Sequence, residues 1–139
     1  MKMKNLNNGQ FHLEQARKGR FTIVLSDVTL RELKPAPLSI RELTESIPDK
    51  YLDLVSLTEE QDILAQRYIQ EGVLTAKFET DAQHIAMATI LRVDSLVSWN
   101  FKHMVNFFRI KQYNSINLKF EYQAIDIRTP KEVTYGNEN

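Results

Sequence analysis

The chain has 139 residues, of which 42% are hydrophobic and 26% charged, and this is the size and composition of one globular domain. Its 18 basic and 18 acidic side chains cancel, so no global positive field holds the chain on nucleic acid and any RNA contact has to be local. The absence of cysteine excludes disulfides and thiolate metal sites. No apolar run approaches membrane-spanning length, so we expect a cytoplasmic protein that is not bound to a membrane.

The N-terminal half alternates helix and strand patterns. The run FTIVLS at 21–26 is nearly all apolar or β-branched, which is typical of a strand buried on both faces of a parallel sheet. Thr58 is expected to cap a helix at 59–71 that Gly72 ends. The remaining expectations for this half are a polar, disordered stretch at 1–10, helices at 11–19, 28–33 and 38–46, and a strand at 51–57.

The C-terminal half continues the alternation. A loop at 73–78 leads to a helix that Asp81 opens, followed by a strand at 94–99. Strands and helices joined by short links predict a three-layer α/β/α fold with a mainly parallel sheet, in one domain at 11–134. The other expected elements are a helix at 101–112, strands at 115–120 and 122–127, and a polar tail at 135–139.

Three stretches, taken in this order, resemble the PIN-domain family, the fold shared by the ribonuclease toxins of bacterial toxin–antitoxin pairs. They are SDVTLRELKPAP at 26–37, FETDAQHIAMAT at 78–89 and VDSLVSWNFKHMVN at 93–106, and the resemblance covers roughly 11–133. It implies a PIN-like three-layer fold, metal-dependent cleavage of an RNA substrate and a homodimer. For toxin members it also implies a small antitoxin whose peptide fills the acidic groove.

The family's site positions carry over one residue at a time. Glu32 matches the Glu on the helix after the second strand, Asp81 the Asp that opens a later helix, and Asn100 the Asp or Asn that follows the fourth strand. The Asp that ends the first strand has no match, because no Asp precedes Asp27 and 1–10 contains no apolar run. We therefore expect a shortened or degenerate member, or a true start upstream.

The resemblance implies hydrolysis of a phosphodiester with Mg²⁺ or Mn²⁺, hard ions that favour carboxylate and water oxygens. Such an ion polarises a phosphate oxygen and lowers the pKa of a bound water. Glu32 and Asp81 are the expected metal ligands, with Asn100 as a neutral oxygen ligand or a donor that positions water or phosphate. Because two carboxylates and an amide hold the metal less tightly than three or four carboxylates, we expect weak or absent nuclease activity.

Each candidate also has a simpler structural interpretation. Glu32 could be a solvated helix residue, Asp81 an acid that complements a helix dipole, and Asn100 a helix cap. Ser98 would either hold a water or ligand with its hydroxyl or bond the backbone at a strand end, and His84 would either reach the site or only pack. The alternative function is a non-catalytic PIN-like binding or scaffold domain, which would tolerate alanine at both carboxylates.

Overall fold

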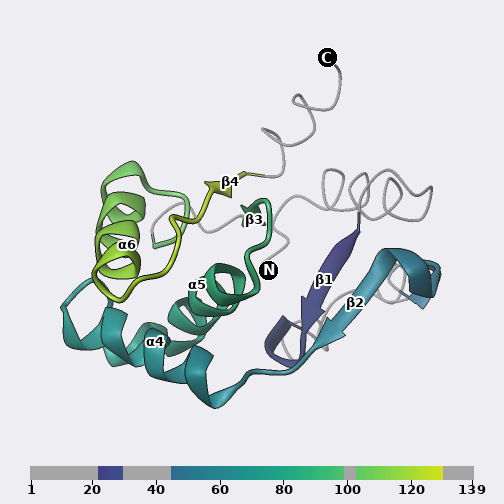
Figure 1. The fold of residues 1–139 in the computed structure, drawn as a ribbon, viewed down its shortest axis with the longest axis horizontal. Helices are drawn as coiled ribbons and strands as arrows, with labels where there is room; N and C mark the ends of the chain where they lie inside the picture. The colour runs from purple at the N-terminus through teal and green to yellow at the C-terminus, as the bar shows by residue number, and fades with distance from the viewer. Residues whose placement is uncertain (1–21, 30–44, 99–102, 130–139) are drawn as a thin grey trace. The chain divides into compact units, whose positions relative to one another are not determined.

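The computed structural model describes residues 22–29, 45–98 and 103–129 (Figure 1). The chain divides into two compact units, one formed by Met1–Ser56 with Pro130–Asn139 and the other by Leu57–Thr129. The segments 1–10 and 135–139, expected to be disordered or polar, lie outside the described residues. The single domain expected at 11–134 remains a prediction.

The first unit contains a pair of parallel strands, β1 (Ile23–Ser26) and β2 (Leu52–Val55), in which Ile23 lies opposite Leu52 (Figure 1). Both lie within the strands expected at 21–26 and 51–57. Directly after β1 the chain turns into a helix, and the Ser26 hydroxyl accepts a hydrogen bond from the Thr29 N–H at 3.0 Å. A short 3₁₀ helix, η1 (Asp49–Tyr51), precedes β2. The expected helix at 11–19 and most of those at 28–33 and 38–46 lie outside the described residues.

The second unit is built on three helices, α4 (Glu59–Gln70), α5 (Glu79–Leu91) and α6 (Phe107–Lys119). The expected cap of α4 is confirmed: the Thr58 hydroxyl accepts from the Gln61 N–H at 3.2 Å, and the Gln61 side chain accepts from the Thr58 N–H at 3.0 Å. This reciprocal pair satisfies two N–H groups that an uncapped helix start leaves without partners. Gly72 follows the helix with φ of 81°, a left-handed conformation that glycine adopts without strain.

Helix α5 lies at the centre of this unit and packs along α4 (Figure 1). It is buried on most of its circumference, because alanines alternate with larger apolar residues and let neighbouring elements approach closely. The short 3₁₀ helix η2 (Ala76–Phe78) leads into it. The hydrophobic core of the unit is formed by side chains from α4, α5 and α6 and from the segments that connect and follow these helices. Its members include Leu64, Tyr68, Leu74, Ile85, Ala86, Met104, Tyr113, Ile116 and Ile125.

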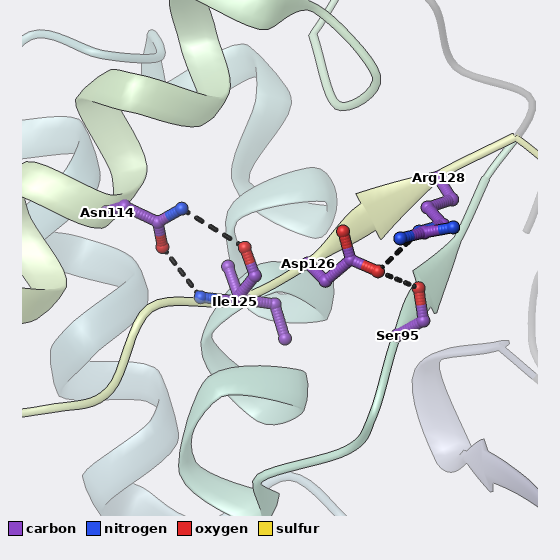
Figure 2. A network of polar contacts seen from close by, with 5 residues as sticks. All are labelled: Ser95, Asn114, Ile125, Asp126 and Arg128. Atoms are coloured by element: carbon purple, nitrogen blue, oxygen red, sulfur yellow. Dashed lines mark hydrogen bonds and ion pairs between the residues drawn. The ribbon is translucent and has the colours of Figure 1, made fainter.

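A second parallel strand pair, β3 (Leu96–Val97) and β4 (Ile127–Arg128), lies in the same unit. Figure 2 shows the polar contacts around it: the Asp126 carboxylate accepts from the Ser95 hydroxyl at 2.8 Å and from Arg128 Nε at 2.6 Å. The Asn114 side chain on α6 forms two hydrogen bonds with the backbone of Ile125, just before β4. It accepts from the Ile125 N–H at 2.7 Å and donates to the Ile125 carbonyl at 3.1 Å. These bonds fix where β4 begins.

Several expected boundaries in this unit are wrong. Residues 115–119, expected in a strand at 115–120, belong to α6. This helix begins at Phe107 rather than 101, because Asn106 caps it by accepting from the Arg109 N–H at 3.1 Å. Of the strand expected at 94–99, the described residues form only the two-residue β3. The strand expected at 122–127 is displaced to β4, which shares only Ile127 with it. The expected loop at 73–78 contains η2.

The chain is therefore a mixed α/β protein whose strands pair in parallel, as the sequence predicts. Within the described residues the strands form two separate two-stranded sheets rather than one continuous sheet. Among 22–29, 45–98 and 103–129, no helix is long and apolar enough to cross a membrane.

Candidate functional site

The structure describes three of the five residues proposed for the site. Glu32 and Asn100 lie outside the described residues. Asp81, His84 and Ser98 all belong to the second unit, the first two on α5 and the third directly after β3.

Asp81 lies in the first turn of α5, which begins two residues earlier at Glu79. It therefore does not open the helix, and Phe78 occupies the N-cap position without a side-chain hydrogen bond. The Asp81 side chain is half-buried. A carboxylate at this place is stabilised by the positive end of the helix dipole, typically by about 0.3–1 kcal/mol.

Tyr113 on α6 is a neighbour of Asp81 that sequence reasoning missed. Its ring is fully buried, and its hydroxyl donates to the backbone carbonyl of His103. Burial raises the pKa of Tyr113 above its ordinary value, the positive charge of Arg109 lowers it, and the negative charge of Asp81 raises it further. Tyr113 thus stays protonated near neutral pH and provides no base for a hydrolytic step.

Arg109 and His103 complete this neighbourhood. The Arg109 guanidinium donates from Nη1 to the carbonyl of Val73, which ties the start of α6 to the segment after α4. The imidazole of His103 lies against the ring of Phe78, with ring centroids 3.9 Å apart and planes at 36°. The first turn of α5 is thus bordered by the aromatic rings of Phe78, His103 and Tyr113.

His84 and Ser98 are both buried. The Ser98 N–H donates to the Arg128 carbonyl at 3.0 Å and continues the β3–β4 ladder, while its hydroxyl lies 3.5 Å from the Met104 sulfur. Ser98 thus lies at a strand end, and the partner of its hydroxyl at 3.5 Å is a sulfur atom and not the backbone. His84 lies one turn of α5 after Asp81.

Metal ligation was tested on the described residues alone. Among these, no group of three or more His, Asp or Glu side chains converges in a way that could hold an ion. Of the two expected anionic ligands, only Asp81 is described. A group of three ligands that included Asp81 would therefore need at least one member from outside these ranges.

The three helices of the second unit differ sharply in charge. Helices α4 and α5 carry Glu59, Glu60, Asp62, Glu79 and Asp81 but only one basic residue, Arg67. Helix α6 carries Arg109, Lys111 and Lys119 and no acid, and the sequence contains no Asp or Glu between Asp94 and Glu121. The lack of acidic residues in this run is the feature of the sequence that predicts a positively charged helix here.

Two phenylalanines at the start of α6 are largely exposed, Phe107 by 76% and Phe108 by 68%. The ammonium of Lys111 lies 4.7 Å from the centroid of the Phe107 ring, a cation–π arrangement. Large apolar side chains that cluster at the surface often mark a binding site, so this end of α6 is a second candidate.

Comparison with protein-family models, with curated proteins and with solved structures finds no match for this chain. Two places in the described residues are candidates for function, the first turn of α5 around Asp81 and the exposed start of α6.

Proposed function

We propose that the chain is a metal-dependent ribonuclease of the PIN type with low activity, and that it serves as the toxin of a toxin–antitoxin pair. The observation that carries the proposal is the half-buried Asp81 in the first turn of α5, followed along the chain by the parallel strand β3 that leads toward Asn100. This is the order of helix, strand and polar residue that the resemblance implies. The proposal includes a three-layer α/β/α arrangement, a homodimer and an antitoxin peptide as partner.

The chemistry assigns one role to each residue. Glu32 and Asp81 would hold Mg²⁺ or Mn²⁺ through their carboxylates, and Asn100 would contribute its amide oxygen or position the attacking water. The ion supplies positive charge to the scissile phosphate and acidifies a bound water. His84 and Ser98 would support the ligands. With one carboxylate fewer than the family's pattern, metal affinity and cleavage are both expected to be low.

The test is cleavage of a mixed-sequence RNA in Mn²⁺, with EDTA as the metal-free reference. Asp81→Asn keeps the shape of the side chain but removes the anionic ligand, so cutting should stop. Glu79→Gln is the matched control, because Glu79 lies in the same turn, is exposed, and faces the same helix dipole. Equal cutting by wild type and Asp81→Asn would refute the proposal.

A second candidate function is a non-catalytic RNA-binding domain of the same shape. The observation that favours it is the basic helix α6 with its exposed Phe107 and Phe108, which needs no metal to bind an anionic partner. Here alanine at Glu32 and Asp81 should leave RNA binding unchanged. Loss of binding in that double variant, with its circular dichroism spectrum intact, would favour the nuclease instead.

A further inference from the structure

The start of α6 carries two exposed phenylalanines in succession, and the ammonium of Lys111 lies over the first of their rings. We call Phe107, Phe108 and Lys111 the aromatic–lysine surface. Both rings are more than two thirds exposed, whereas most large apolar side chains of this unit are buried in its core. Leaving two adjacent phenyl rings in water is unfavourable in the free protein, and a ligand that covers them regains that free energy.

The positive charge of the aromatic–lysine surface favours a negatively charged ligand. Of the three cations on α6, Arg109 donates to the Val73 carbonyl, and Lys119 pairs with the Glu71 carboxylate at 2.7 Å. Lys111 contacts the face of the Phe107 ring, and no carboxylate of the described residues lies within ion-pair distance of it. The whole chain has no net charge, so any RNA binding needs a local positive site. Lys111 provides such a site.

The spacing of exposed residues on α6 argues against a helical protein partner. A helix that docks into an apolar groove presents apolar residues at intervals of three and four over two or more turns. On α6 the exposed positions that follow Phe108 on this face are Lys111 and Ser115, and the next apolar one is Leu118. The rings are therefore confined to one turn, which suits a small planar group better than a long apolar stripe.

Single-stranded RNA offers the chemistry that matches both parts of the surface. Its bases stack on aromatic rings whatever their sequence, and its phosphates bind cations placed beside those rings. We propose that Phe107, Phe108 and Lys111 form a contact site for single-stranded RNA, with a base stacked on a phenyl ring and a neighbouring phosphate at the Lys111 ammonium. The inference rests on the proposed function, since it names the surface that would hold the substrate of the ribonuclease.

Binding is measured by fluorescence anisotropy of a labelled single-stranded RNA in EDTA, so that cleavage plays no part. A Phe107→Ala/Phe108→Ala variant should bind at least about 5-fold more weakly if one ring stacks on a base, and at least about 30-fold more weakly if both do. Lys111→Gln should lower the slope of log affinity against log salt by about 0.7, which corresponds to one phosphate contact on a single strand. All three side chains are solvent-exposed, so circular dichroism melts should stay close to the wild type.

The matched control is Leu118→Ala, which removes an apolar side chain that is 63% exposed near the other end of the same helix. It should bind RNA as the wild type does. The proposal is overturned if the wild type does not bind RNA in EDTA, or if the double phenylalanine variant binds as tightly as the wild type. It is also overturned if that variant only converts a dimer to a monomer in sedimentation, because a second copy of the chain would then be the occupant.

The outcome separates this inference from the ribonuclease proposal. If the aromatic–lysine surface binds RNA as described and no RNA is cut in Mn²⁺, the surface stands and the nuclease assignment fails. If RNA is cut in a manner that depends on Asp81 while the surface variants bind normally, the nuclease assignment stands and the surface does not.

Discussion

Asn117 on α6 is the residue whose replacement tests the packing of the second unit most sharply. Its side chain is completely buried at 0% exposure and accepts a hydrogen bond from the Tyr68 hydroxyl on α4. Its Nδ2 donates to the Thr89 hydroxyl on α5 at 3.3 Å and to Asn114 Oδ1 at 3.2 Å. One amide thus joins α4, α5 and α6. The change to test is Asn117→Leu, which keeps the branched shape and the number of heavy atoms and removes every hydrogen bond.

The magnitude follows from counting which groups lose their partners. The Thr89 hydroxyl keeps its bond to the Ile85 carbonyl at 2.8 Å, and Asn114 keeps its bonds to Ile125. Only the Tyr68 hydroxyl loses its acceptor, and an unsatisfied buried group costs about 1–3 kcal/mol. The Thr89 hydroxyl is also a hydrogen-bond neighbour of the Tyr68 phenol, and because it donates its own proton to the Ile85 carbonyl, its oxygen offers a substitute acceptor. We therefore expect a loss of about 1–2 kcal/mol in the free energy of unfolding.

The assay is urea unfolding followed by far-ultraviolet circular dichroism, with equal m values required for a comparison of midpoints. Tyr68→Phe alone should also destabilise, because it leaves the Asn117 carbonyl oxygen without its donor. The double variant removes both partners and should lie within about 1 kcal/mol of the wild type, far from the sum of the single losses. Ser115→Ala, an exposed change on the same helix, serves as control and should shift stability by less than about 0.5 kcal/mol.

Strict additivity of the two single losses would refute this reasoning. It would mean that the Tyr68 hydroxyl and the Asn117 side chain do not bond each other in solution. The same experiment tests the register of α6, since Asn117 reaches α4 and α5 only when 115–119 is helical.

Three further predictions test other contacts of the fold. Thr58→Ala should cost about 1 kcal/mol through loss of the α4 cap, whereas Thr58→Ser should cost much less; equal losses in urea unfolding would contradict the cap. Asn114→Ala should cost about 1–3 kcal/mol and speed amide exchange at Ile125, and unchanged exchange there would show that the clamp is not formed. Burial raises the pKa values of Tyr68 and Tyr113, so the unfolded chain releases these protons first, near pH 10, and stability should fall as the pH rises above that value. Tyrosinate absorbance should show these two phenols ionising only as the chain unfolds, and ionisation of all five tyrosines in the folded protein would contradict this.

The strongest local signals in the sequence predicted their elements well. Helix α4 was expected at 59–71 and runs from Glu59 to Gln70, because Thr58, Gln61 and Gly72 determine its ends through local hydrogen bonds and one backbone angle. The strands β1 and β2 were found from short apolar runs. Such signals depend only on neighbours in sequence, so the sequence alone suffices to detect them.

Helix α6 shows where that reasoning fails. Ile116, Leu118 and Phe120 alternate with polar residues, which is the pattern of a half-buried strand. In the structure Ile116 and Asn117 are buried next to each other and Leu118 is exposed. The polar Asn117 can be buried because Tyr68, 49 residues earlier, donates to it, and no local pattern reveals a partner at that separation.

The candidate site was predictable only in part. The sequence was enough to expect Asp81 near a helix start, and it lies in the first turn of α5. Its neighbour Tyr113 comes from α6, whose boundaries were predicted wrongly, so the approach of Tyr113 to Asp81 could not be foreseen. The exposed Phe107 and Phe108 were missed because a helix expected at 101–112 does not by itself indicate which of its aromatic side chains face solvent.

Line broadening of backbone amides by Mn²⁺ tests the ribonuclease proposal most directly, because the paramagnetic ion reports a weak site at the residue where it binds. Amides in the first turn of α5 should broaden in the wild type and in Glu79→Gln, and the effect should disappear in Asp81→Asn. Broadening that persists in Asp81→Asn, or that never reaches α5 in the wild type, would contradict the assignment of Asp81 as a metal ligand and with it the proposed nuclease.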